Sequence, residues 1–216
     1  MHLPARFLAI ARVLLASAAP FFRWTDARRP SVRIAGLTVV VHPDSGTPNS
    51  FLPALQEALA LLAAVAPNRL RRLRQDVLRI LVEPWSGTAG YSRRSRAIIL
   101  HPDHVGSCST AWLAAGLVHE SIHARLANSR IRTTIRNLSR IERRCCAEQI
   151  DFLTRLPASH AAEAERCVAW IQQCLTASEP WYDPARRFRE LVRSVSDRSS
   201  RPQKAARVKK DRAPDV

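Results

Sequence analysis

Residues 117–123 read Leu-Val-His-Glu-Ser-Ile-His, an H-E-x-x-H motif within an apolar stretch that predicts a buried helix over about 110–126. Residues four positions apart lie on one face of a helix, so the imidazoles of His119 and His123 can bind a single metal ion. Glu120 follows the first histidine, where its carboxylate can accept a proton from a bound water. The motif therefore indicates a zinc site that supports hydrolysis. The alternative is an ordinary helix whose histidines hydrogen-bond to their neighbours.

Hydrophobic periodicity along the chain predicts an α+β fold, with a small mixed sheet and a mostly helical C-terminal part. Residues 84–90 read as a loop. The expected strands cover 31–42 (a pair, or one strand bent at Gly36), 77–82 and 96–100, and the expected helices cover 51–65 with an extension over 70–76, 110–126, 131–138, 139–156, 161–175 and 184–195.

The motif, with a strand that ends just before its helix, resembles the zincin superfamily of zinc metallopeptidases. The resemblance covers approximately residues 77–156, and its specific part is the motif itself. It implies that the strand over 96–100 forms the upper edge of the substrate cleft. It also implies a zinc-dependent cleavage of peptide bonds, in which Glu120 activates the attacking water.

Catalytic zinc keeps three protein ligands and one open position, so a third ligand is required. The zincin branch with a third histidine in an extended motif is excluded, because Leu126 and Ser129 occupy the positions of its glycine and histidine. The gluzincin branch takes a glutamate from a later helix, where Glu142 and Glu148 are the candidates. At about 100° per residue, Glu142 falls within the apolar arc of its helix and Glu148 falls among charged residues. A carboxylate among core residues needs a strong partner, so Glu142 is the preferred ligand.

The resemblance also bears on residues that would support the metal ligands. The gluzincin resemblance implies an aspartate four residues after the third ligand, but Cys146 stands there, and Gln149 is a substitute for orienting a ligating histidine. The resemblance also implies a side chain that stabilises the oxyanion. Tyr182 and Tyr91 are the candidates, and packing or turn roles are the alternative for both.

Composition adds a domain organisation and possible partners. The 216 residues carry a formal net charge of +16, and the 196–216 segment reads as a basic, disordered tail. Residues 1–30 read as an N-terminal amphipathic helix, which leaves 31–195 as the zincin-like catalytic domain. The charge favours contact with a polyanion, either nucleic acid or an anionic membrane surface, unless the arginines are simply spread over solvated faces. No apolar run reaches membrane-spanning length.

Cysteine usage bears on the compartment. The five cysteines are odd in number and form no C-x-x-C pair, which favours reduced thiols and a cytoplasmic protein. Cys145 and Cys174 are expected as small core residues.

The sequence therefore predicts a zinc metallopeptidase in which His119, His123 and Glu142 (or Glu148) bind Zn²⁺ and Glu120 is the general base, with a peptide or protein as its substrate. The alternative is a catalytically silent protein that uses a zincin scaffold for binding or regulation and contacts nucleic acid through its basic surface.

Overall fold

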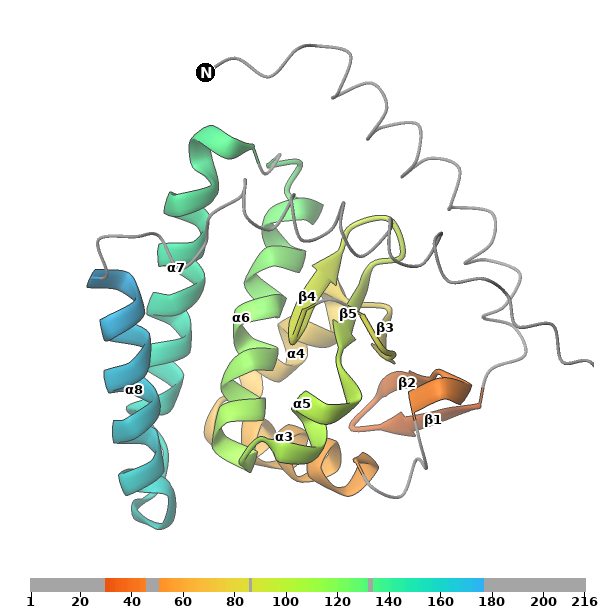
Figure 1. Ribbon diagram of the computed structural model, residues 1–216, viewed down its shortest axis with the longest axis horizontal. Helices are drawn as coiled ribbons and strands as arrows, with labels where there is room; N and C mark the ends of the chain where they lie inside the picture. Colours follow the sequence, from red (N-terminus) through yellow and green to blue (C-terminus); the bar gives the residue numbers. More distant parts are fainter. Residues whose placement is uncertain (1–29, 46–50, 86, 132–133, 177–216) are drawn as a thin grey trace, which may run out of the picture.

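The computed structural model describes residues 30–45, 51–85, 87–131 and 134–176, in which a five-stranded sheet packs against a layer of helices (Figure 1). The predicted α+β class with a small mixed sheet is confirmed. The strands are β1 (Ser31–Ile34), β2 (Leu37–Val41), β3 (Arg79–Val82), β4 (Ala89–Ser92) and β5 (Ala97–Leu100); the helices are α3 (Leu52–Val65), α4 (Pro67–Asp76), α5 (Pro102–Ser107), α6 (Thr110–Asn128), α7 (Ile135–Leu153) and α8 (Ala161–Thr176), with 3₁₀ turns at Pro43–Ser45 and Ala158–His160.

The sheet has the order β1-β2-β3-β5-β4, and its three central strands run parallel. The outer strands β1 and β4 each run antiparallel to their neighbour. A tight turn joins β1 to β2, where Ala35 and Gly36 have φ angles of 48° and 80°. Two successive positive φ angles suit a two-residue hairpin, so residues 31–42 form a strand pair and not one bent strand.

The edge of the sheet lies elsewhere than the sequence predicts. Strand β5 pairs with β3 on one side and with β4 on the other, so residues 96–100 are not the edge strand of the sheet. The edge strand is β4, which begins at Ala89, at the end of the segment expected as a loop. Its sequence, Ala-Gly-Tyr-Ser, has little intrinsic preference for a strand, and its pairing with β5 creates one.

Helix α6 is the centre of the molecule. It packs against α3, α4, α7 and β4, and it carries the most buried residues of any described helix. The Ser109 hydroxyl caps its first turn by accepting a hydrogen bond from the Trp112 N–H at 3.3 Å. The apolar stretch around the motif is thus a buried helix, as the sequence predicts.

Two helix boundaries differ from the predicted ones. Helix α7 is one continuous helix from Ile135, whereas the sequence predicts separate helices over 131–138 and 139–156. A capping box at Thr134 and Asn137 starts it early, and its apolar face then continues past residue 139. Helix α4 is a separate helix that begins at Pro67, not an extension of α3, because proline favours the first helical turn.

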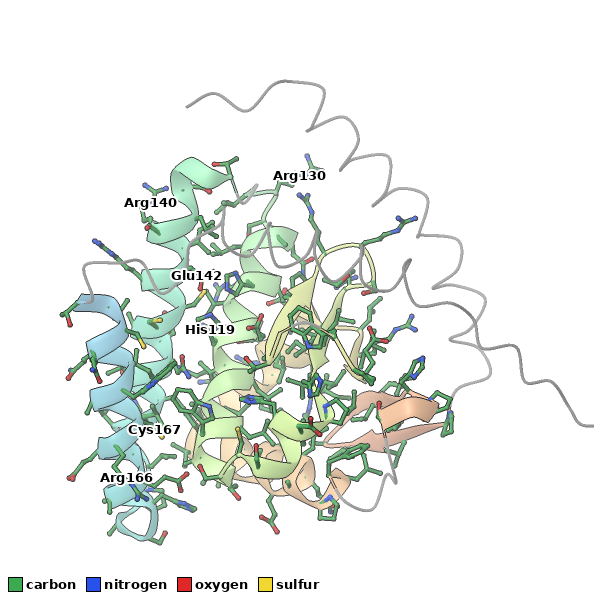
Figure 2. The ribbon with its side chains drawn as sticks, viewed as in Figure 1. His119, Arg130, Arg140, Glu142, Arg166 and Cys167 are labelled. Carbon is green, nitrogen blue, oxygen red and sulfur yellow. The ribbon has the colours of Figure 1, made fainter. Side chains whose placement is uncertain are left out.

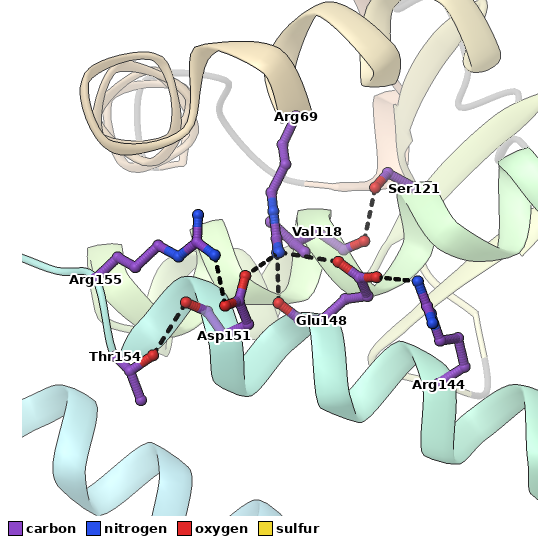
Figure 3. A network of polar contacts seen from close by, with 8 residues as sticks. All are labelled: Arg69, Val118, Ser121, Arg144, Glu148, Asp151, Thr154 and Arg155. Carbon is purple, nitrogen blue, oxygen red and sulfur yellow. Dashed lines mark hydrogen bonds and ion pairs between the residues drawn. The ribbon is translucent and has the colours of Figure 1, made fainter.

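Figure 3 shows the network of ion pairs that joins α4 to the outer face of α7. The Arg69 guanidinium donates to the Glu148 carboxylate at 2.9 Å, to the Glu148 carbonyl oxygen and to the Asp151 carboxylate. The same two carboxylates also bind Arg144 of α7 and Arg155 of the turn that follows this helix. The Arg69 side chain is only 16% exposed, so the network is partly buried where α4 meets α7.

Some sequence predictions concern residues outside the described part of the chain. These are the N-terminal helix over 1–30, apart from Pro30, the helix over 184–195, the tail over 196–216 and Tyr182. Among the described residues, no helix has the length and apolar character needed to cross a bilayer.

We expect Arg69→Ala to lower the free energy of unfolding by about 1–3 kcal/mol, because two partly buried carboxylates lose their shared partner. Arg155→Ala is the matched control. Its side chain is 60% exposed, and its loss should cost less than about 0.5 kcal/mol. Urea unfolding of both variants measures the difference, and equal losses would contradict a special role for Arg69.

Candidate metal centre

The candidate site lies between α6 and α7, which run side by side (Figure 1). His119 and His123 stand one turn apart on α6. Glu142 and Gln149 stand seven residues apart, or two turns, on the facing side of α7. Figure 2 shows His119 and Glu142 close together between the two helices. The helices are antiparallel, so Gln149 meets the earlier histidine, and both histidines meet Glu142.

Three donor groups converge on one point. The Nε2 atom of His119 lies 3.2 Å from Oε2 of Glu142, and Nε2 of His123 lies 3.4 Å from Oε1. The two Nε2 atoms are 3.3 Å apart. A tetrahedral zinc ion with bonds of about 2.0–2.1 Å holds its nitrogen and oxygen ligands about 3.3 Å from one another. The separations match this spacing, although the two histidines meet different oxygens of the Glu142 carboxylate.

The contact with Gln149 determines which ring nitrogen of His119 carries the lone pair. Its Oε1 lies 3.2 Å from Nδ1 of His119, where an amide oxygen accepts a hydrogen bond from Nδ1–H. The lone pair of the imidazole is then on Nε2, which faces the other donors. Gln149 is 5% exposed, and it contacts one of the two motif histidines.

Without an ion, protons must supply the positive charge in this site. Burial lowers the pKa of His123, but hydrogen bonds with Cys145 and Glu142 and the charge of Glu120 raise it to about 10. Burial likewise lowers the pKa of His119, and hydrogen bonds with Cys146 and Glu142 raise it well above its usual value. Burial raises the pKa of Glu142, but its two histidine partners hold it at about 2.

Two protonated imidazoles would place their Nε2–H groups only 3.3 Å apart, which is electrostatically unfavourable. A divalent cation resolves the conflict, because it binds both nitrogens through their lone pairs and neutralises the carboxylate. These donors could therefore hold a metal ion.

Cys145 is a donor that the sequence analysis treated only as a core residue. One ligand atom each of His119, His123 and Cys145 lie within 4.8 Å of one another, so these residues could also hold a metal ion. Cys145 is fully buried and follows Glu142 by three residues, which places both on one face of α7. This i,i+3 spacing, together with the affinity of thiolates for zinc, is the sequence feature from which Cys145 could have been predicted as a metal ligand.

The remaining candidates are placed as follows. Glu120 is 7% exposed and lines a cavity of about 750 Å³ together with both histidines. The Glu148 carboxylate binds Arg69 of α4 and Arg144 (Figure 3), so it is engaged in that network and not with the histidines. Tyr91 lines the cavity from β4.

His104 also lines this cavity. Burial and the neighbouring His101 lower its pKa, so its imidazole is neutral near pH 7.

Comparison with known proteins identifies no relative, because no family model, no curated protein and no solved structure matches this chain. The metal centre is therefore argued from its own residues.

The metal-free protein should lose stability as the pH rises from 6.5. The pKa of His123 rises from 6.5 to about 10 on folding, so its contribution is complete below pH 6.5 and is lost as the pH approaches 10. The pKa of Glu142 falls from 4.5 to about 2, so its contribution is present above pH 4.5 and is lost as the pH falls through 2. Thermal unfolding with a chelator measures this dependence.

Zinc competes with the same protons, so its stabilising effect should increase over the range in which the metal-free protein weakens. An unchanged slope in His123→Gln would contradict this assignment.

Removal of Glu142 should weaken zinc binding by more than the roughly 10- to 100-fold loss that is typical of residues supporting a metal ligand. Glu148→Ala is the matched control, since it removes a glutamate of the same helix that contacts arginines instead. We expect it to bind zinc with unchanged affinity. Competition with a chromogenic chelator measures both, and equal affinities of the two variants would exclude Glu142 as a ligand.

Proposed function

We propose that this protein is a zinc-dependent hydrolase whose substrates are peptides or proteins. The observation that carries the proposal is the convergence of His119 Nε2, His123 Nε2 and the Glu142 carboxylate at separations of 3.2–3.4 Å. Two imidazoles and a carboxylate at tetrahedral spacing suit zinc, and three protein ligands leave the fourth position for water.

Glu120 supports a catalytic interpretation of the site. It lies between the two histidines in sequence, and its side chain lines the same cavity. When bound, zinc supplies a Lewis acid that polarises a carbonyl group and acidifies water. The Glu120 carboxylate can accept the proton of the attacking water and then deliver it to the leaving amine. Gln149 keeps the His119 ring in the orientation that this chemistry requires.

The shape of the surroundings favours a peptide substrate. Ala89, Gly90 and Tyr91 of β4 line the cavity on the side opposite α7. Strand β4 is the last strand in the order of the sheet, so its outer edge has no strand partner among the described residues. An extended peptide can pair with such an edge through main-chain hydrogen bonds and present its carbonyl groups to the metal.

The test of this function is Glu120→Gln. The variant should bind one zinc ion per chain with wild-type affinity and should lose hydrolysis of a peptide library by at least about 100-fold, the lower range for a general base. Glu57→Gln is the control, since this glutamate lies on α3, where it accepts a hydrogen bond from Thr110. Wild-type hydrolysis by Glu120→Gln would exclude the mechanism.

A closed metal site is the second candidate, and Cys145 is the observation that favours it. If Cys145 and Glu142 both bind the ion with the two histidines, four protein ligands complete a tetrahedral site. Such a site joins α6 to α7 and leaves no position for water, as expected for a binding or regulatory protein.

Cobalt substitution separates the two candidates. Cobalt bound to a thiolate shows an intense ultraviolet charge-transfer band, whereas cobalt bound only by nitrogen and oxygen does not. The hydrolase proposal predicts no such band and no change in Cys145→Ser. A band that disappears in Cys145→Ser and remains in Cys146→Ser would favour the closed site.

A further inference from the structure

We propose that the cavity forms an elongated substrate groove whose far end, at Trp112 and Trp170, binds an aromatic or large aliphatic side chain about four residues from the scissile bond. This inference rests on the proposed function, because it takes the occupant of the groove to be the extended substrate.

The groove follows one face of α6. The cavity is lined in turn by Trp112, Gly116, the motif residues and Ala127, which recur every three or four positions along this helix. At a rise of about 1.5 Å per residue, the distance from Trp112 to Ala127 is about 22 Å. An extended peptide advances about 3.3 Å per residue, so the groove accommodates about six or seven residues.

The metal centre lies within this length and not at its end. The midpoint of the two motif histidines is nine residues beyond Trp112, or about 13 Å along the helix axis. This distance corresponds to about four residues of an extended chain. The aromatic end of the groove therefore contacts a side chain well separated from the bond that is cleaved.

Two tryptophans from different helices form the aromatic end. The Trp112 ring on α6 and the Trp170 ring on α8 meet edge to face, with their centroids 5.1 Å apart and their planes at 88°. Trp170 nevertheless remains 51% exposed, and both rings line the cavity. A large aromatic surface that is held in place and still exposed is suited to bind an apolar side chain, especially an aromatic one.

Gly116 keeps the path open between the metal centre and the tryptophans. It lies one turn before His119, and a Cβ atom built on it would meet no other atom within 4 Å. Glycine is a poor helix former, yet here it stands in the middle of the central helix. Its missing side chain leaves room for a substrate to pass along the helix surface.

The experiment uses the full-length, zinc-loaded protein and peptide hydroxamates, in which the hydroxamate binds the metal and so fixes the position of every residue. Two series carry the hydroxamate at the C-terminal or the N-terminal end of an alanine peptide. Phenylalanine is then placed at the first to sixth residue from it. Isothermal titration calorimetry measures the affinity of each peptide.

In one series, phenylalanine at about the fourth residue should bind at least about tenfold more tightly than alanine there, because its side chain leaves water. Trp170→Ala should abolish this preference. Ile131→Ala is the matched control, because Ile131 lines the other end of the cavity and is 42% exposed. It should leave the preference intact.

A second variant tests the groove by blocking it, so that the packed Trp170 ring stays in place. Gly116→Phe should weaken binding of the preferred peptide by at least about tenfold and should leave acetohydroxamate binding unchanged. Gly106→Phe is its control, since a Cβ at Gly106 also meets nothing within 4 Å and this glycine does not line the cavity.

The outcomes separate this inference from the proposed function. Acetohydroxamate binding without any phenylalanine preference, or a preference that survives Trp170→Ala, overturns the groove. Failure to bind both zinc and acetohydroxamate overturns the metal centre, and the groove with it.

Discussion

The structure depends on one electrostatic requirement, which is that two imidazole nitrogens 3.3 Å apart share a single buried carboxylate. A buried carboxylate is costly unless it has a positive partner, and two adjacent imidazoles cannot comfortably both be protonated. Glu142 holds the two histidines together, and its charge favours a positive partner between them, either a proton or a metal ion. A protein without a use for a cation would be expected to place apolar residues at this position of the core.

The pairing of α6 with α7 satisfies that requirement, and contacts on both sides of α7 fix its rotation. On its inner side, Gln149 binds His119 two turns away from Glu142. On its outer side, Arg69 from α4 binds two carboxylates. A rotation of α7 that brought Glu148 towards the histidines would break both sets of contacts. The ion pairs of Figure 3 thus decide which of the two glutamates faces the metal centre.

Those parts of the molecule that follow from local patterns could be predicted from the sequence. The burial of α6 follows from its apolar composition, and the inward position of Glu142 follows from the 3.6-residue period of α7. Strand β4 could not be predicted, because Ala-Gly-Tyr-Ser forms a strand through its pairing with β5.

The role of Cys145 could not be separated from packing by sequence alone. An apolar arc predicts burial, and burial suits both a small core residue and a metal-binding thiol. To tell a core residue from a metal-binding thiol, one must know where the opposite helix lies. The hydrophobic periodicity of a single helix does not give that position. The same limit applies to Trp170, whose contact with Trp112 depends on how α8 packs beside α6.

The candidate centre has four donor residues, His119, His123, Glu142 and Cys145. Whether three or all four of them bind an ion decides whether a position remains open for water. Glu142 and Cys145 are three residues apart on α7, and their surroundings differ. Glu142 lines the cavity together with Glu120, whereas Cys145 is fully buried and does not line it. An ion held by the histidines and Glu142 therefore faces a space of about 750 Å³ that water and substrate can enter. An ion drawn towards Cys145 would move into the helix interface and away from Glu120. Because Glu120 lies on the cavity side, the proposed hydrolytic role requires the open arrangement of ligands.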